Sequence, residues 1–209
     1  MPRLVAGGRI KALFSEEGEL ICLELDGKRY EGVGDSAPIP LSQLKNLKLG
    51  EIPEDVFIEP VKSIEGNVVY GLELGELFSY TTRFSRNLAE VEVFSWTAEW
   101  DDVVGPRAYL RALTSIVKEL EKAGLVESHY VEKEEKWFTL TFLLKVPEGL
   151  TVPRAVKLIK KIAQEVEAEV EYRATRLALK ELRKRMRMMG KPEETFSTRF
   201  KKIYADVNG

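Results

Sequence analysis

The stretch "AEVEVFSWTAEW" (residues 89–100), followed by "GPRAYLRALTSIVKELEKAGL" (residues 105–125), decides the fold expected for this chain. Apolar and polar residues alternate at the start of the first stretch, which is typical of a strand with one buried face. The second stretch has apolar residues at helical spacing, with Pro106 in its first turn and Gly124 as a stop signal. We therefore expect a long strand that leads into an amphipathic helix.

The residues after this helix predict a hairpin, a second helix and a final strand. "VESHYV" (126–131) and "KWFTLTFLLKV" (136–146) flank a charged turn, and the residues from Thr151 to Val166 have helical periodicity. In residues 166–175, Val and Ala alternate with Glu and Arg, which favours a strand. The order strand, helix, strand, strand, helix, strand is the ferredoxin-like βαββαβ arrangement. The alternative is one unbroken helix from Pro153 to Met189, because apolar residues also recur near helical spacing.

The first 85 residues consist of short alternating runs separated by turn residues. "GRIKALF" (8–14), "ELICLEL" (19–25) and "KRYEGV" (28–33) predict a three-stranded meander, with Asp26-Gly27 as a hairpin turn. Further short runs favour a small β-barrel. The expected class is therefore α+β, with three parts: a small β-barrel domain at 1–85, a ferredoxin-like domain at 89–175, and a C-terminal basic amphipathic helix with an aromatic tail at 176–209.

Composition favours a globular cytoplasmic protein and argues against several kinds of site. Apolar residues make up 44% of the 209 residues, and no run of eighteen apolar residues occurs. Charged residues make up 32%, which together with scarce Gln is typical of proteins from hot environments. A single Cys22 and a single His129 argue against a disulfide framework, a zinc site or a Ser-His-Asp triad. No cofactor or metal is expected.

The strongest functional signal is a concentration of positive charge near the end of the chain, in "ALKELRKRMRMMGK" (178–191). Residues 173–209 contain eleven Lys and Arg and four acidic residues, a net charge of +7, whereas the whole chain has −2. Residues 1–172 therefore carry −9. At about 100° per residue the cations fall in one arc of roughly 100°, opposite Ala178, Leu182, Met186 and Met189. The predicted stripe consists of Arg173, Arg176, Lys180, Arg183, Lys184, Arg187 and Lys191.

Three interpretations of this stripe remain open at the level of sequence. It could be a solvated face, or one that docks on the acidic part of the same chain, of a second copy or of another acidic protein. It could bind the phosphates of DNA or RNA, with salt-sensitive and sequence-independent affinity. A membrane surface fits less well, because the apolar side offers Met and Leu but no Trp or Phe. We expect a nucleic-acid-associated protein, with a scaffolding or self-associating module as the alternative.

Aromatic residues on the central strands suggest a second contact surface. In "KWFTLTFLLKV", Phe138, Leu140, Phe142 and Leu144 are the expected buried set, which leaves Trp137 toward the open face of the sheet. There Trp137 could stack on the bases of a single strand. Phe94, Trp96 and Trp100 share one face of their strand, and the sequence allows this face to be either open or buried beneath the helices.

Two further features have simpler explanations than chemistry. Asp101 and Asp102 stand where a magnesium-dependent nucleotidyl-transfer or cyclase-like enzyme would hold its metal, but capping of the following helix explains them more simply. An enzyme is therefore a remote alternative. Phe196, Phe200 and Tyr204, spaced four apart in the tail, favour packing on the protein itself or on a sister subunit.

Overall fold

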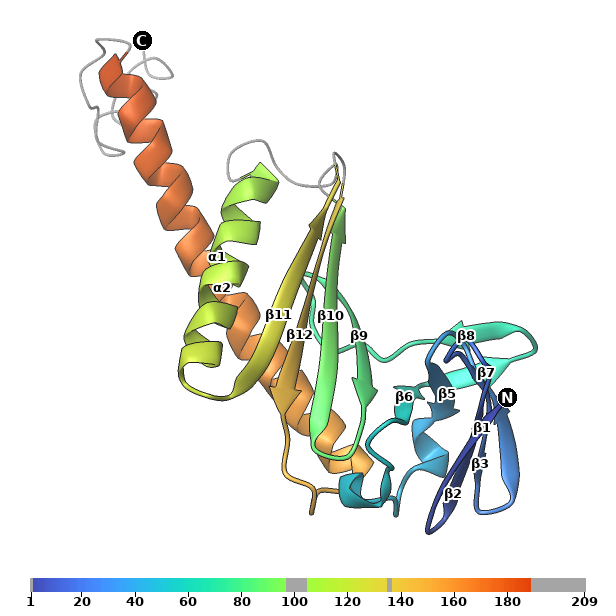
Figure 1. Cartoon of the computed structure of the whole chain (residues 1–209). Helices are drawn as coiled ribbons and strands as arrows, with labels where there is room; N and C mark the ends of the chain where they lie inside the picture. Colours follow the sequence, from blue (N-terminus) through green and yellow to red (C-terminus); the bar gives the residue numbers. More distant parts are fainter. Residues whose placement is uncertain (1, 97–104, 135–136, 189–209) are drawn as a thin grey trace, which may run out of the picture.

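Twelve strands and two long helices form a mixed α+β fold (Figure 1), seen in a computed structural model that describes residues 2–96, 105–134 and 137–188. The strands belong to a four-stranded sheet of order β1-β2-β3-β4, a two-stranded sheet β7-β8, and a six-stranded sheet of order β11-β12-β10-β9-β6-β5. Both helices lie on one face of the six-stranded sheet. This layer of helices carries the candidate site.

The N-terminal sheet is an antiparallel meander of β1 (Arg3–Gly7), β2 (Ile10–Phe14), β3 (Leu20–Leu25) and β4 (Lys28–Glu31). Asp26 and Gly27 both have positive φ, as a tight two-residue hairpin turn requires, so the predicted meander is confirmed. The prediction of a β-barrel is wrong, because these described strands form an open sheet with β1 and β4 at its edges. The strand that follows β4 in the chain belongs to the six-stranded sheet instead.

The six-stranded sheet combines residues from both sides of the predicted domain boundary. Its first strands, β5 (Ser36–Pro40) and β6 (Phe57–Val61), are parallel, and two short 3₁₀ helices, η1 (Leu41–Gln43) and η2 (Leu49–Glu51), lie between them. The hairpin β7 (Ser63–Glu65) and β8 (Val68–Tyr70) follows β6. The antiparallel strands are β9 (Ser79–Phe84), β10 (Leu88–Trp96), β11 (Val126–Lys133) and β12 (Trp137–Lys145). The division into domains stays a prediction.

The helix α1 (Gly105–Lys122) lies where the sequence predicted it, and its buried residues belong to the same core as those of the sheet. Val91, Val93 and Ser95 of β10 are buried, and β12 buries the four alternating residues that the sequence singled out. The buried side chains form one continuous core that also reaches the N-terminal sheet. The core residues of α1 and β12 are Ala112, Leu113, Ile116, Val117, Phe138, Leu140, Phe142 and Leu144.

The second helix, α2 (Val152–Met188), corrects the ferredoxin-like prediction. Residues 166–175 are helical, so the final strand is not formed and the alternative of one long helix is the correct one. Buried residues in this region recur at the helical spacing of Ala163, Glu167, Val170 and Ala174. The place beside β10 that a final strand would take is occupied by β9, which precedes β10 in the chain.

A buried carboxylate attaches the middle of α2 to the loop before β9. Glu167, only 8% exposed, accepts hydrogen bonds from the backbone N–H groups of Glu76 (2.9 Å), Leu77 (3.0 Å) and Phe78 (3.2 Å). It also accepts one from the Tyr80 hydroxyl at 2.9 Å, and burial together with this carboxylate raises the pKa of Tyr80. Four donors therefore compensate for taking this charge out of water.

Candidate nucleic-acid interface

The last turns of α2 extend beyond the rest of the molecule (Figure 1). Ala174 is fully buried, but from Thr175 to Arg187 every described side chain is exposed except that of Ala178, which is intermediate. We call residues 175–188 the projecting segment. At 1.5 Å per residue it is about 20 Å long. Its stability depends on continuity with the packed part of α2, because an isolated helix of this length is marginal in water.

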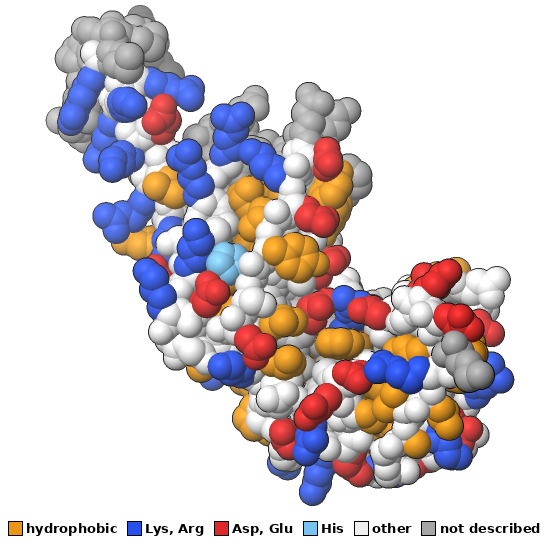
Figure 2. Space-filling model, viewed as in Figure 1, with side chains coloured by type: hydrophobic (Ala, Val, Ile, Leu, Met, Phe, Trp, Pro, Cys, Tyr) orange, Lys and Arg blue, Asp and Glu red, His pale blue; other side chains and the backbone are white. Residues whose placement is uncertain are grey.

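The projecting segment places five cations on one side, as the sequence predicted. Since all of them lie within α2, their spacing puts them in an arc of roughly 100°, and all five are exposed. Figure 2 shows the blue Lys and Arg side chains gathered along this end of the helix. We call the five residues the cationic stripe: Arg176, Lys180, Arg183, Lys184 and Arg187.

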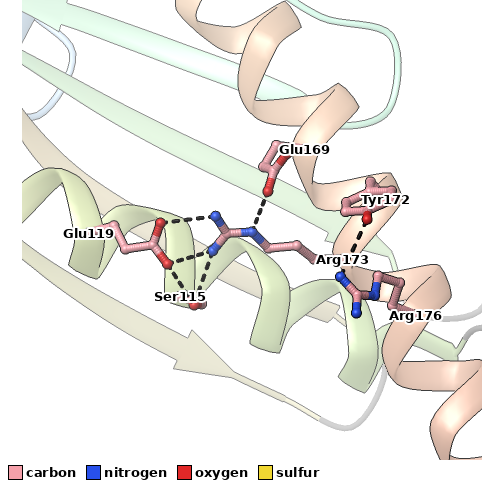
Figure 3. A network of polar contacts seen from close by, with 6 residues as sticks. All are labelled: Ser115, Glu119, Glu169, Tyr172, Arg173 and Arg176. Carbon is pink, nitrogen blue, oxygen red and sulfur yellow. Dashed lines mark hydrogen bonds and ion pairs between the residues drawn. The ribbon is translucent and has the colours of Figure 1, made fainter.

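Arg173, at the base of the projecting segment, has a different role from the stripe (Figure 3). Its guanidinium donates to both carboxylate oxygens of Glu119 on α1, at 2.6 and 2.9 Å, and to Glu169 on α2 at 2.6 Å. It also lies 3.3 Å from the Ser115 hydroxyl. These partners raise the pKa of Arg173 and lower the pKa of Glu119. Arg173 therefore joins the two helices, and its charge is already compensated.

The stripe residues differ in their contacts within the protein. The Arg176 guanidinium lies 5.6 Å from the ring centre of Tyr172 and 3.3 Å from its hydroxyl, which leaves its charge without a carboxylate partner among the described residues. Lys180 and Lys184 form no ion pair with any described residue. The neighbouring Arg185, outside the stripe, pairs with Glu181 at 3.4 Å. The charges of Arg176, Lys180 and Lys184 are therefore not neutralised by a carboxylate of the described residues.

Trp137 lies apart from the stripe. It is partly buried, and its ring centre is 6.0 Å from that of Phe94, with the ring planes tilted by 34°. Because the buried residues of β10 are Ala89, Val91, Val93 and Ser95, Phe94 lies on the sheet face away from the helices, and so does Trp137. The sequence did not decide which face of β10 lies beneath the helices. The aromatic pair and the stripe therefore lie on opposite sides of the sheet.

Some predicted features fall outside the described residues, namely Lys191, Asp101, Asp102, Trp100 and the aromatic tail. Within the described ranges, no group of three or more acidic, His or Cys side chains could hold a metal ion. Cys22 is partly exposed, and His129 Nδ1 lies 3.0 Å from a Glu121 carboxylate oxygen. The magnesium-dependent enzyme thus stays a prediction without support from the described side chains.

The sequence interpretation missed a second set of cations, which lies on α1. Arg107, Arg111, Lys118 and Lys122 are all exposed on the side of α1 opposite its buried face. Their spacing of 4, 7 and 4 residues was a readable signal for one helical face. Together α1 and α2 contain fifteen Lys and Arg and seven Glu, a net charge of +8.

Comparisons with protein-family models, with curated proteins and with solved structures found no match. No helix in the described ranges is long and apolar enough to cross a membrane.

Proposed function

We propose that this protein binds nucleic acid through contacts between the cationic stripe and backbone phosphates. The observation that carries the proposal is a row of exposed cations on a helix that extends beyond the body, with Lys180 and Lys184 unpaired among the described residues. Close like charges repel one another, and an array of phosphates relieves this repulsion while releasing counterions. Such contacts carry no base specificity. The class of ligand is therefore a phosphodiester backbone.

The salt dependence of binding tests this proposal. If four or five stripe cations each neutralise one phosphate of a duplex, log K should fall with log salt with a slope of about −4. Fluorescence anisotropy of a labelled oligonucleotide, titrated at about 50 to 200 mM salt, measures this slope. A salt-independent affinity would contradict the proposal.

A matched pair of charge reversals identifies the residues. The double substitution Lys180→Glu with Lys184→Glu should reduce affinity at least about 100-fold at low salt, because two phosphate contacts become repulsive. The control is Lys157→Glu with Lys161→Glu, which changes two exposed cations by the same charge on the packed half of α2. Equal losses in both variants would show that net charge matters rather than the stripe.

A protein partner is the second candidate, and one observation favours it. Leu177, Leu179 and Leu182 are exposed on the projecting segment, by 39%, 49% and 44%. Exposed leucines on an unpartnered helix are typical of a helix that docks on another protein or on a second copy. Under this function, Leu179→Ser with Leu182→Ser would dissociate an oligomer measured by light scattering and leave nucleic-acid affinity unchanged. A monomeric mass for the unsubstituted protein at all concentrations would argue against self-association.

A further inference from the structure

The four exposed cations of α1 form a row of their own. Arg107, Arg111, Lys118 and Lys122 fall within an arc of about 60°, because their spacings of 4, 7 and 4 residues return to the same side of a helix. None of the four forms an ion pair with another described residue. We call these residues the α1 row. It is about 22 Å long at 1.5 Å per residue.

A shallow groove follows this side of α1 and adds hydrogen-bonding groups to the row. It is lined by Leu110, Arg111, Thr114, Ser115, Lys118, Glu119 and Lys122, and the Glu119 carboxylate among them is bonded to Arg173. Hydroxyl groups alternating with Lys and Arg are a usual set of donors to phosphate oxygens. The groove therefore resembles the stripe in chemistry and extends the electropositive surface onto a second helix.

The α1 row and the cationic stripe lie next to each other. The two helices run in opposite directions, and the second half of α1 lies beside the base of the projecting segment (Figure 1). Arg173 joins the helices there through Ser115 and Glu119. In Figure 2 the Lys and Arg side chains gather along both helices, whereas many Asp and Glu side chains lie over the strands. Packed helices are about 8 to 10 Å apart between axes.

Two neighbouring rows of cations suit a duplex better than a single strand. A single strand presents one row of phosphates, whereas a duplex presents two rows across a groove, about 6 Å or 12 Å wide in B-form DNA. Where α1 and α2 pack together, a typical distance of about 8 to 10 Å between helix axes is of the same order as these widths. One row can therefore contact each strand.

The position of the aromatic residues also favours a duplex over a single strand. Binders of single strands combine cations with aromatic rings on one surface, so that phosphates and bases are held together. Here Trp137 and Phe94 lie on the other side of the sheet, and Glu92 of β10 lies on the same face. A strand held by the helices cannot stack on these rings.

We propose that the α1 row is part of the binding surface and that its ligand is a nucleic-acid duplex, contacted along both phosphate backbones by α1 and α2. This inference rests on the proposed function and specifies its ligand. Duplexes of DNA and of RNA share the chemistry that is recognised, and the experiment separates them.

The experiment compares a labelled single strand, a DNA duplex and an RNA duplex of equal length with the full-length protein, by anisotropy at several salt concentrations. A duplex should bind at least about tenfold more tightly than the single strand, because it engages both rows. Tighter binding of the DNA duplex or of the RNA duplex shows which of the two nucleic acids is the ligand. The double substitution Arg111→Gln with Lys118→Gln should weaken duplex binding about tenfold or more and make the salt slope shallower by about 1.8. Its effect on the single strand should be much smaller.

The control for this variant is Arg29→Gln with Lys45→Gln, which removes two exposed cations from the N-terminal part of the chain. Two results would overturn the duplex inference: a single strand that binds as tightly as a duplex, or an α1 variant that binds a duplex like the control. Absence of binding to all three oligonucleotides would instead overturn the proposed function itself. The two failures are therefore distinguishable.

Discussion

The two halves of α2 have the same backbone structure but opposite surroundings. Residues 152–174 contribute Val152, Ala155, Ile159, Val170 and Ala174 to the core, whereas the projecting segment has no fully buried described side chain. Two polar attachments hold the packed half, Glu167 to the loop before β9 and Arg173 to α1. One continuous helix is thus structural in its first part and exposed to solvent in its last part.

A proline substitution in each half of α2 should test the difference between the two halves most clearly. Lys161→Pro, at an exposed position of the packed half, should cost about 3 kcal/mol or more of unfolding free energy, because α2 is part of the core. Leu179→Pro should melt only the projecting segment, which lowers the helical circular dichroism signal and weakens oligonucleotide binding. Its unfolding free energy should change by less than about 0.5 kcal/mol. Equal destabilisation by both prolines would show that the projecting segment packs on the body.

Removal of the Glu167 carboxylate tests the first attachment. Glu167→Ala leaves three backbone N–H groups and the Tyr80 hydroxyl without their acceptor, and we expect a loss of about 3 kcal/mol in chemical denaturation. The control Glu165→Ala removes an exposed carboxylate from the same helix and should cost less than about 0.5 kcal/mol. Gly75→Ala should act on the same network, because its Cβ would lie 2.2 Å from a Glu167 oxygen. Similar stabilities for Glu167→Ala and its control would refute the attachment.

Arg173 tests whether the second attachment positions the projecting segment. Arg173→Gln should reduce oligonucleotide affinity about three- to tenfold without changing the salt slope, because a joint between helices is lost and no phosphate contact is removed. Lys180→Gln, by contrast, should make the slope shallower by about 0.9. Faster amide exchange in residues 175–188 of Arg173→Gln would identify the positioning role. A slope that changes as in Lys180→Gln would mean that Arg173 itself contacts phosphate.

The smallest expected effect is a pH dependence of the stability that the pair of Arg173 and Glu119 contributes. Arg173 lowers the folded-state pKa of Glu119, so this carboxylate stabilises the fold at pH values above its unfolded pKa of about 4.3. The stabilisation is lost as the pH falls through the folded-state pKa. The melting temperature of Glu119→Gln should therefore lie slightly below that of the unsubstituted protein at neutral pH. This difference should shrink at acidic pH. Glu127→Gln, on the exposed side of β11, is the control and should show no such convergence.

Local signals predicted the elements that depend on neighbours in the chain. Asp26-Gly27 identified a hairpin because both residues tolerate positive φ. The alternation from Phe138 to Leu144 identified the apolar core residues of β12, although Thr139 and Thr141 on its other face are buried as well. The cationic stripe was visible because helical spacing brings residues 176–187 to one side. In each of these cases the relevant interaction acts over a few residues.

The sequence predictions were wrong where contacts between residues far apart in the chain determine the structure. Val166, Val170 and Ala174 are spaced four apart and also alternate with charged residues, so period alone could not separate helix from strand in residues 166–175. Packing against the core and the bonds from Glu167 to residues about 90 positions earlier favour the helix. Arg173 was counted with the stripe because Glu119, its partner on α1, is distant in the sequence.

The length of the projecting segment has an electrostatic consequence for a protein whose net charge is −2. At physiological ionic strength the Debye length is about 8 Å, so a polyanion at the tip of a segment about 20 Å long is shielded from the acidic strands. Near 10 mM salt the Debye length grows to about 30 Å, so repulsion from the acidic strands then reaches the tip and offsets part of the attraction of the stripe. The projection thus lets an acidic protein present a locally basic surface under the salt conditions of a cell.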